Sequence, residues 1–449
     1  MGDLALNIAA SGLDAQQTAM DTISENLTNA NTAGYVSESA QLTANPGGDL
    51  LGVGDGVRVV AVTQNADNLL ATNALQSQGV LAQTTALQQI LQGAQAVFPE
   101  PGSAGISADL SSFWQSWDAI SQDPSNAAPR TEVVDQAENL VSDFQQAAGQ
   151  LNNLQDNAQA QVTQSVTEAN TELAQVANLN QKITTTEGSG APANSLIDQR
   201  NQILGQLANN IGAVGVVQPD GTLNVDVGGV TLVQGSWSDT ITTTGGAGDM
   251  SLVAQASGVT IPTSAGSVAG QLAAVNQYLP GYQSQLDEAA DDLASTVNTQ
   301  LAAGYTATGT SGAGLPLFQG TGAAGLSVNA SIVANPELIA ASSTGALPDA
   351  TNNGANAQAM AELFNVTGGP DEQYQSLIQN LGSQVQAVNN QVQAQTSVAN
   401  AATENLQSIE GVNTNDQMVQ MLTYQQAFQA SAKLVSTVDT MMQALIQAS

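Results

Sequence analysis

Gly411-Val412-Asn413-Thr414-Asn415-Asp416-Gln417, with the helical run that follows it to Ser449, is the stretch that decides the fold of this chain. Apolar residues in the run recur at alternating spacings of three and four, which is the heptad pattern of a coiled coil. They are Met421, Tyr424, Phe428, Val435, Val438, Met442 and Leu445, with Ser431 as the polar member of the series. A helix of this length spans roughly 50 Å at 1.5 Å per residue. Its apolar stripe needs a partner from elsewhere.

The quoted stretch itself predicts a boundary between two helices. Gly411 suits the end of the preceding helix, because glycine enters the left-handed region without a Cβ penalty. Thr414 and Gln417 have the spacing of a capping box for the helix that follows. We therefore expect a short connection at 411–413.

The beginning of the chain offers a second apolar seam of matching length. Its members have the same alternating spacing and are Leu6, Ala9, Leu13, Gln16, Met20, Ile23, Leu27 and Ala30. Two ordinary surface helices packed on one core are the simpler alternative. Matched heptads at both ends instead favour pairing of the termini, within one chain or between copies. The predicted subunit-interface residues are Leu6, Leu13, Met20, Ile23, Leu27, Met421, Tyr424, Phe428, Val435, Val438, Met442 and Leu445.

Between the two ends the chain alternates long helical patterns with one β-rich segment. Apolar positions at helical spacing run through 131–209, 267–301 and 371–409, with mostly uncharged polar residues between them and a break expected at Pro280. From Ile211 the pattern changes to short β-capable runs separated by glycine-containing turns. The predicted fold is mainly α with an inserted β domain. A long antiparallel helical rod is built from both chain halves, with terminal coiled-coil helices and a small all-β outer domain.

Three regions are predicted from these patterns. The terminal coiled-coil helices comprise 1–35 and 410–449. The helical rod, with short β segments, comprises 36–208 and 269–409. The inserted β domain comprises 209–268. Each layer except the β domain is therefore built from both halves of the chain.

Composition excludes several classes of function. Five Lys+Arg against 38 Asp+Glu give a formal net charge of −33, so neither nucleic acid nor an anionic membrane surface is an expected partner. The chain has no histidine and no cysteine, which excludes histidine bases, thiol nucleophiles and zinc sites built on either residue. We predict no catalytic, cofactor-binding or metal-binding residue and no enzyme activity. A hydrolase that uses only carboxylates stays open, but no site points to it.

The sequence also bears on location. The sequence contains no run of 18 apolar residues, so we expect no membrane span. The beginning shows no basic region followed by an apolar core, so we expect no cleavable signal peptide.

Both ends resemble the bacterial flagellar rod, hook and hook-associated proteins. The segments that carry the resemblance are Ile8-Ala9-Ala10-Ser11-Gly12-Leu13-Asp14-Ala15-Gln16-Gln17, Ile23 to Tyr35, Gly411-Val412-Asn413, and Tyr424-Gln425-Gln426-Ala427-Phe428-Gln429-Ala430-Ser431-Ala432-Lys433. Within that family, Ser195-Leu196-Ile197-Asp198-Gln199-Arg200 resembles a segment typical of hook-associated members.

The resemblance implies a structural subunit of the flagellum, an adaptor at the hook–filament junction that is required for filament assembly. Its implied partners are copies of itself in a helical or ring assembly, the hook protein, the next junction protein and an export chaperone. It implies an extracellular location, reached through the flagellar type III export channel. The alternatives are a hook or distal-rod subunit, against which the long helical stretch 131–209 argues, and an exported coiled-coil adhesin or binding protein.

Overall fold

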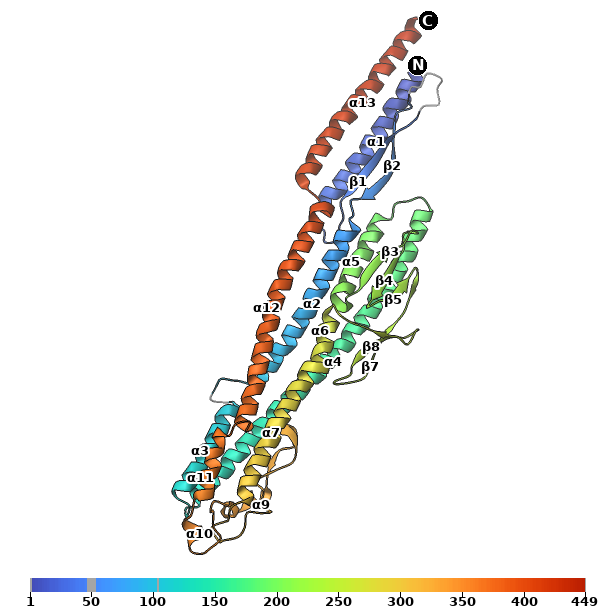
Figure 1. The fold of residues 1–449 in the computed structure, drawn as a ribbon. Coiled ribbons are helices and arrows are strands. Elements are labelled where there is room, and N and C mark those ends of the chain that lie inside the picture. Colours follow the sequence, from blue (N-terminus) through green and yellow to red (C-terminus); the bar gives the residue numbers. More distant parts are fainter. Residues whose placement is uncertain (1, 47–53, 103–104, 449) are drawn as a thin grey trace.

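The terminal helices form a separate pair at one end of a long rod (Figure 1). The computed structural model describes residues 2–46, 54–102 and 105–448. Helix α1 (Gly2–Thr28) lies beside α13 (Thr414–Ala448) over most of its length, and both chain ends lie at the same tip of the molecule. The two helices are therefore antiparallel. They are the predicted terminal helices, and they pair within one chain.

The rod below them contains helices from both halves of the chain, as the sequence predicts. Helix α2 packs along α12, and α4 spans most of the rod beside α5, α6 and α7 (Figure 1). The bounds of the rod helices are α2 Asn68–Val97, α3 Ile106–Gln122, α4 Ala128–Gly188, α5 Asn194–Ile211, α6 Ser267–Ala273, α7 Leu279–Ala302 and α12 Pro370–Glu410. Short helices complete the far end: α8 Gly322–Gly325, α9 Ala330–Ala334, α10 Asp349–Asn352 and α11 Ala355–Ala361.

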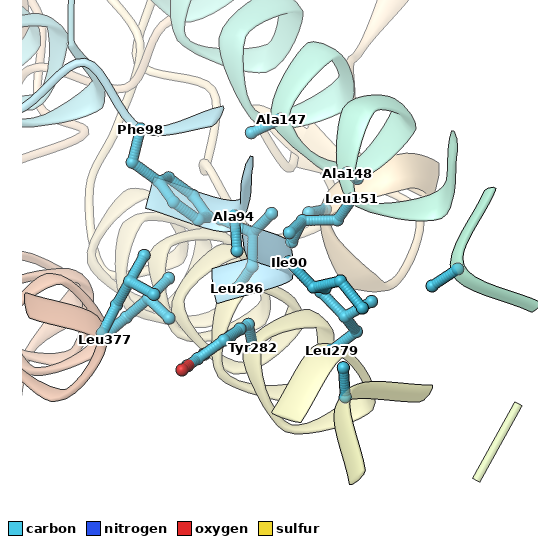
Figure 2. Packing of buried hydrophobic residues seen from close by; sticks show 14 of the residues in the cluster. Ile90, Ala94, Phe98, Ala147, Ala148, Leu151, Leu279, Tyr282, Leu286 and Leu377 are labelled. Atoms are coloured by element: carbon cyan, nitrogen blue, oxygen red, sulfur yellow. The ribbon is translucent and has the colours of Figure 1, made fainter. Parts of the chain in front are cut away.

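The apolar stripes predicted for these helices form one continuous core. Figure 2 shows its middle, where Leu151 of α4, Tyr282 of α7 and Leu377 of α12 approach Phe98, the residue directly after α2. At the far end the aromatic residues of α3 are buried, with Trp117 fully enclosed. Burial of each large apolar side chain stabilises the folded chain by about 1.5–3 kcal/mol. The buried residues extend from the middle of the rod to its far end.

One predicted helix break has a different form. The sequence predicts an interruption at Pro280, but the structure places a π-helical turn over Ala274–Tyr278, directly before α7. Proline lacks an N–H and its ring clashes with the carbonyl four residues earlier. Ala273 and Leu279, on either side of the π turn, have right-handed helical backbone, so α6 and α7 continue as one helix through it.

The β-rich segment forms two small antiparallel sheets against α4 (Figure 1). The first has the strand order β3-β4-β5-β6 and the second β7-β8-β9. Their bounds are β3 Val214–Val217, β4 Leu223–Val227, β5 Val230–Gln234, β6 Trp237–Ser238, β7 Ile241–Thr244, β8 Ser251–Ala254 and β9 Thr260–Ile261. Helix α5 ends at Ile211 and therefore includes the first three residues of the predicted β domain, 209–211. A third, two-stranded pairing joins β10 (Phe318–Gln319) to β11 (Ser327–Val328).

Helical asparagines attach the strands to the helices. Each asparagine pairs with one residue of the β region. It donates from Nδ2 to that residue's carbonyl and accepts at Oδ1 from its N–H, as a neighbouring strand would. The pairs are Asn170 with Ile241, Asn180 with Leu223, Asn276 with Met250 and Asn298 with Phe318, all at 2.7–3.1 Å. Three of the four partners are the first residue of a strand, and Met250 directly precedes one. Because buried backbone groups need partners, these side chains fix where each strand begins.

A further hairpin belongs to the tip rather than to the rod. Strands β1 (Glu38–Ala44) and β2 (Val57–Gln64) pair antiparallel with a bulge between Gln41 and Leu42. The hairpin packs on α1 (Figure 1). The sequence assigns both strands to the rod, whereas in the structure they pack on α1 of the terminal pair.

Candidate assembly surface

The stripe predicted on α13 faces α1. Met421, Tyr424, Phe428 and Val435 are half-buried, and Val438 is 4% exposed. Met442, near the end of the helix, is 42% exposed, and the side chain of Leu445 lies outside the described residues. Gln16 of α1 donates to the Ser431 hydroxyl across the seam at 3.4 Å. The C-terminal heptad is therefore the contact between the two ends of the chain.

The stripe predicted on α1 is only partly in that contact. Ile23 is buried and Leu13 and Met20 are half-buried, but Leu6 and Leu27 are 40% and 37% exposed. The first half of the buried line on α1 consists of small residues, Ala9, Gly12, Ala15 and Ala19, and Thr22, Ile23 and Asn26 continue it. A Cβ on Gly12 would come within 3.3 Å of the Ser431 hydroxyl. Small residues let α1 lie close to α13 on one side and the β1–β2 hairpin on the other.

The connection at 411–413 differs from the sequence prediction in two ways. Gly411 is extended, with φ −69° and ψ 155°, and not left-handed. Glycine is needed there because a Cβ would lie 2.4 Å from the Gln407 carbonyl oxygen. Asn413 caps α13 by accepting from the N–H groups of Asn415 and Asp416. The predicted capping box of Thr414 and Gln417 is therefore wrong. Asn413 is the capping residue, and the Gln417 side chain accepts a hydrogen bond from Asn26 instead.

Asn26 joins α1, α13 and β1 at the base of the pair. Its side chain, fully buried, donates to the Glu38 carbonyl at 2.8 Å and to Gln417 Oε1 at 3.2 Å. Its Oδ1 accepts from the Glu38 N–H and from the Tyr35 hydroxyl, both at 2.8 Å. Asn26 thus repeats, at the start of β1, the strand attachment seen in the rod. Burial raises the pKa of the Glu38 carboxyl, which lies beside this cluster.

A second apolar face of α13 points to solvent. Its members, between 46% and 64% exposed, are Met418, Val419, Leu422, Leu434 and Met441. The helix has three charged residues among its 35, Asp416, Lys433 and Asp439. A long exposed helix face with so many apolar side chains is typical of an interaction surface. The heptad pattern of the sequence predicts only the opposite face.

The segment Leu196 to Arg200 has a structural role in the rod. Arg200 is 2% exposed and donates to Asn180 Oδ1 at 3.1 Å and to the Gly221 carbonyl at 2.8 Å. Burial lowers the pKa of its guanidinium group. Asn180 in turn holds Leu223 at the start of β4. Arg200 therefore ties α5 to α4 and to the first turn of the β domain.

The structure also bears on metal sites and membrane spans. Over residues 2–46, 54–102 and 105–448, no group of three or more acidic side chains is arranged to hold a metal ion. In the same part of the chain, no helix combines the length and hydropathy needed to cross a membrane.

Three family profiles match the chain. Residues 91–318 match the helical domain of the flagellar hook-associated protein FlgK. Residues 6–35 match the flagella basal body rod protein family, and residues 408–448 match the C-terminal region of the flagellar basal body rod FlgEFG proteins. The two terminal matches fall on α1 and α13 with their connections. The match to residues 91–318 runs from the end of α2 to β10 and includes the β domain.

Individual relatives agree with the profiles. Flagellar hook-associated protein 1 of Salmonella typhimurium is 26% identical over 555 aligned positions, covering 98% of this chain and 99% of the relative. The protein of the same name from Bacillus subtilis is 25% identical, with 99% and 97% coverage. That from Escherichia coli is 30% identical over 68% of this chain and 58% of its own length. A solved structure described as the flagellar hook junction protein FlgK from Burkholderia pseudomallei has a TM-score of 0.65 at 18% identity, over 76% of this chain and all of that one.

Proposed function

This chain belongs to the flagellar hook-associated protein family of FlgK and is a structural protein of the hook–filament junction, and we propose that it works there as an adaptor. One side of its assembly meets the hook protein and the other meets the next junction protein. A hook or distal-rod subunit and an adhesin are both less well supported, because the FlgK helical-domain match covers residues 91–318. The family is structural, and we propose that this member has no catalytic role.

The adaptor role rests on the terminal helix pair, in which α13 has one apolar face against α1 and a second apolar face exposed. One apolar face of α13 is satisfied by α1 within the chain, while Met418, Val419, Leu422, Leu434 and Met441 remain exposed. Burying such side chains is favourable by about 25 cal/mol per Å². We assign this face to copies of the same chain. With three charged residues, α13 meets little like-charge repulsion when copies pack side by side.

The predicted interface residues then divide between two contacts. Tyr424, Phe428, Val435 and Val438 hold α13 on α1, while Leu6, Leu27 and Met442 are exposed enough to reach a neighbour. Leu13 and Met20, half-buried, lie at the border. The domain division into a terminal pair, a rod and an outer β domain is part of this proposal, with the β1–β2 hairpin placed with the terminal pair.

The flagellum is the location that the family gives. We assign the protein to the outside of the cell, with export through the flagellar channel and the help of an export chaperone. The cysteine-free sequence is compatible with this route, because a chain without cysteine cannot form disulfide cross-links while it travels unfolded.

Limited proteolysis tests the proposed surface. In a dilute monomer, residues 1–35 and 410–449 are expected to be cut well before the rod, because their outer faces lack the neighbours that would bury them. Mass spectrometry of the fragments locates the cuts. Adding isolated hooks that lack junction proteins is expected to protect both termini. Resistance of both termini in the dilute monomer, or no protection by hooks, would count against the proposal.

A further inference from the structure

Two carboxyl-bearing residues of the rod hold the connection to the terminal pair. Asp198 of α5 accepts a hydrogen bond from the Gln64 side chain at 2.6 Å, and its carboxyl group lies against the backbone of Val36. Glu410, the last residue of α12, accepts from the Asp67 N–H at Oε1 (3.0 Å), and its carbonyl accepts from the Ser37 N–H (2.8 Å). Each residue therefore binds both segments that link α1 and the hairpin to the rod, 36–37 and 64–67.

The first turn of α5 completes the contact. Asn194 donates from Nδ2 to the Val62 carbonyl at 3.2 Å, and its own carbonyl accepts from Gln64 at 3.3 Å. Val36 and Ser37, on the other segment, are 6% and 3% exposed. The joint is thus a packed, hydrogen-bonded contact between residues distant in sequence.

The joint is acidic on every side. Burial, and then the charges of Glu38 on β1 and Glu410 on α12, raise the pKa of Asp198 to about 6, against the hydrogen bonds that lower it. Burial and then Asp67 raise the pKa of Glu410, and Glu25 of α1 contributes to the raised pKa of Glu38. Tyr35 faces the same group, and Glu38, Glu25 and Asp198 add to the effect of burial in raising the pKa of its hydroxyl.

We propose that Asp198 is the positioning residue of this joint: by holding residues 36 and 64 against α5, its carboxyl group sets the direction of the terminal helix pair relative to the rod. This concerns the shape of a single chain. It goes beyond the junction role and does not depend on it.

The sign of the pH dependence follows from linkage. A carboxyl group whose pKa is higher in the closed joint than in water makes the closed form the better proton binder. Closure is then favoured most at pH values below the ordinary pKa of an aspartate side chain. It weakens as the pH rises through about 6. The joint is expected to be tightest in acid and looser above neutral pH.

Distances between two spin labels test the proposal. The natural chain has no cysteine, so Ala61→Cys on β2 and Gln181→Cys on α4, both exposed, give two defined attachment points. Asp198→Ala removes the acceptor and is expected to broaden the distance distribution about twofold at neutral pH, by allowing several orientations. Asp198→Asn keeps an acceptor oxygen and is expected to retain the narrow distribution. Asp135→Ala, on an exposed face of α4, is the matched control and is expected to have no effect.

The pH profile separates positioning from general stability. In the unsubstituted background the distribution is expected to narrow from about pH 8 to about pH 5, and Asp198→Asn is expected to lose at least about half of that change. Circular dichroism establishes that each variant is folded. A narrow distribution in folded Asp198→Ala, or one equally broad in Asp198→Asn, would overturn the proposal. Because the measurement uses the monomer, a failed junction role leaves this result unaffected.

Discussion

Replacing Phe428 with aspartate is expected to abolish incorporation of the subunit into flagella while the rod and the β sheets stay folded. Phe428 is half-buried in the α1–α13 seam, and α1 carries four acidic residues and no basic one. A carboxylate there loses hydration without gaining a partner, which costs several kcal/mol. The seam is one long helix contact, so its loss frees α13 from the position in which it meets other copies.

Two matched variants make this test specific. Gln429→Asp adds the same charge one residue away, at an exposed position, and is expected to assemble normally. Leu422→Asp changes the outer face of α13 and is expected to block assembly without disturbing the α1–α13 pair. Incorporation is measured by quantifying the variant in purified flagella, and folding by circular dichroism. Normal incorporation of Phe428→Asp would refute the role of the seam, and equal loss with Gln429→Asp would reduce it to a general charge effect.

Replacing Asn180 with alanine is expected to destabilise the β domain by about 3–5 kcal/mol, since each buried polar group left unpaired costs about 1–3 kcal/mol. Asn180 is fully buried and makes four hydrogen bonds, two with Leu223, one with the Gly235 carbonyl and one with Arg200. Alanine leaves the start of β4 and the buried guanidinium without these partners.

Hydrogen exchange followed by mass spectrometry measures the effect locally. Peptides covering 223–234 are expected to exchange faster in Asn180→Ala, whereas α12 at the far side of the rod is unchanged. Asn178→Ala, exposed on the same helix, is the control and is expected to behave as the natural chain. A change below about 1 kcal/mol in the β-domain peptides would show that the asparagine attachment adds little.

The fold could be predicted because its helices obey simple periodicities. The stripe from Met421 to Val438 lies against α1, and the stripes of α4 and α12 form the rod core, because apolar burial fixes which face of a helix turns inward. The paired termini could be predicted from the same signal. Gly411 shows the limit of local reasoning: the residue type indicates a helix end, but the glycine is extended rather than left-handed.

The polar contacts could not be predicted, because they join residues far apart in sequence. Asn180 and Asn26 sit in helices among many similar polar residues, and nothing local marks them as buried. Asp198 drew attention through a family resemblance alone, which did not reveal that it binds residues 36 and 64. The exposed apolar face of α13 was missed because the heptad facing α1 is the stronger pattern.

Deleting the gene in its own cell and imaging the flagella by electron microscopy tests the junction role most directly. The account predicts hooks without filaments, with flagellin shed into the medium, and recovery of filaments when the gene is restored. Loss of the hook itself would contradict a junction role and point to a hook or rod subunit. Normal flagella would contradict the account altogether.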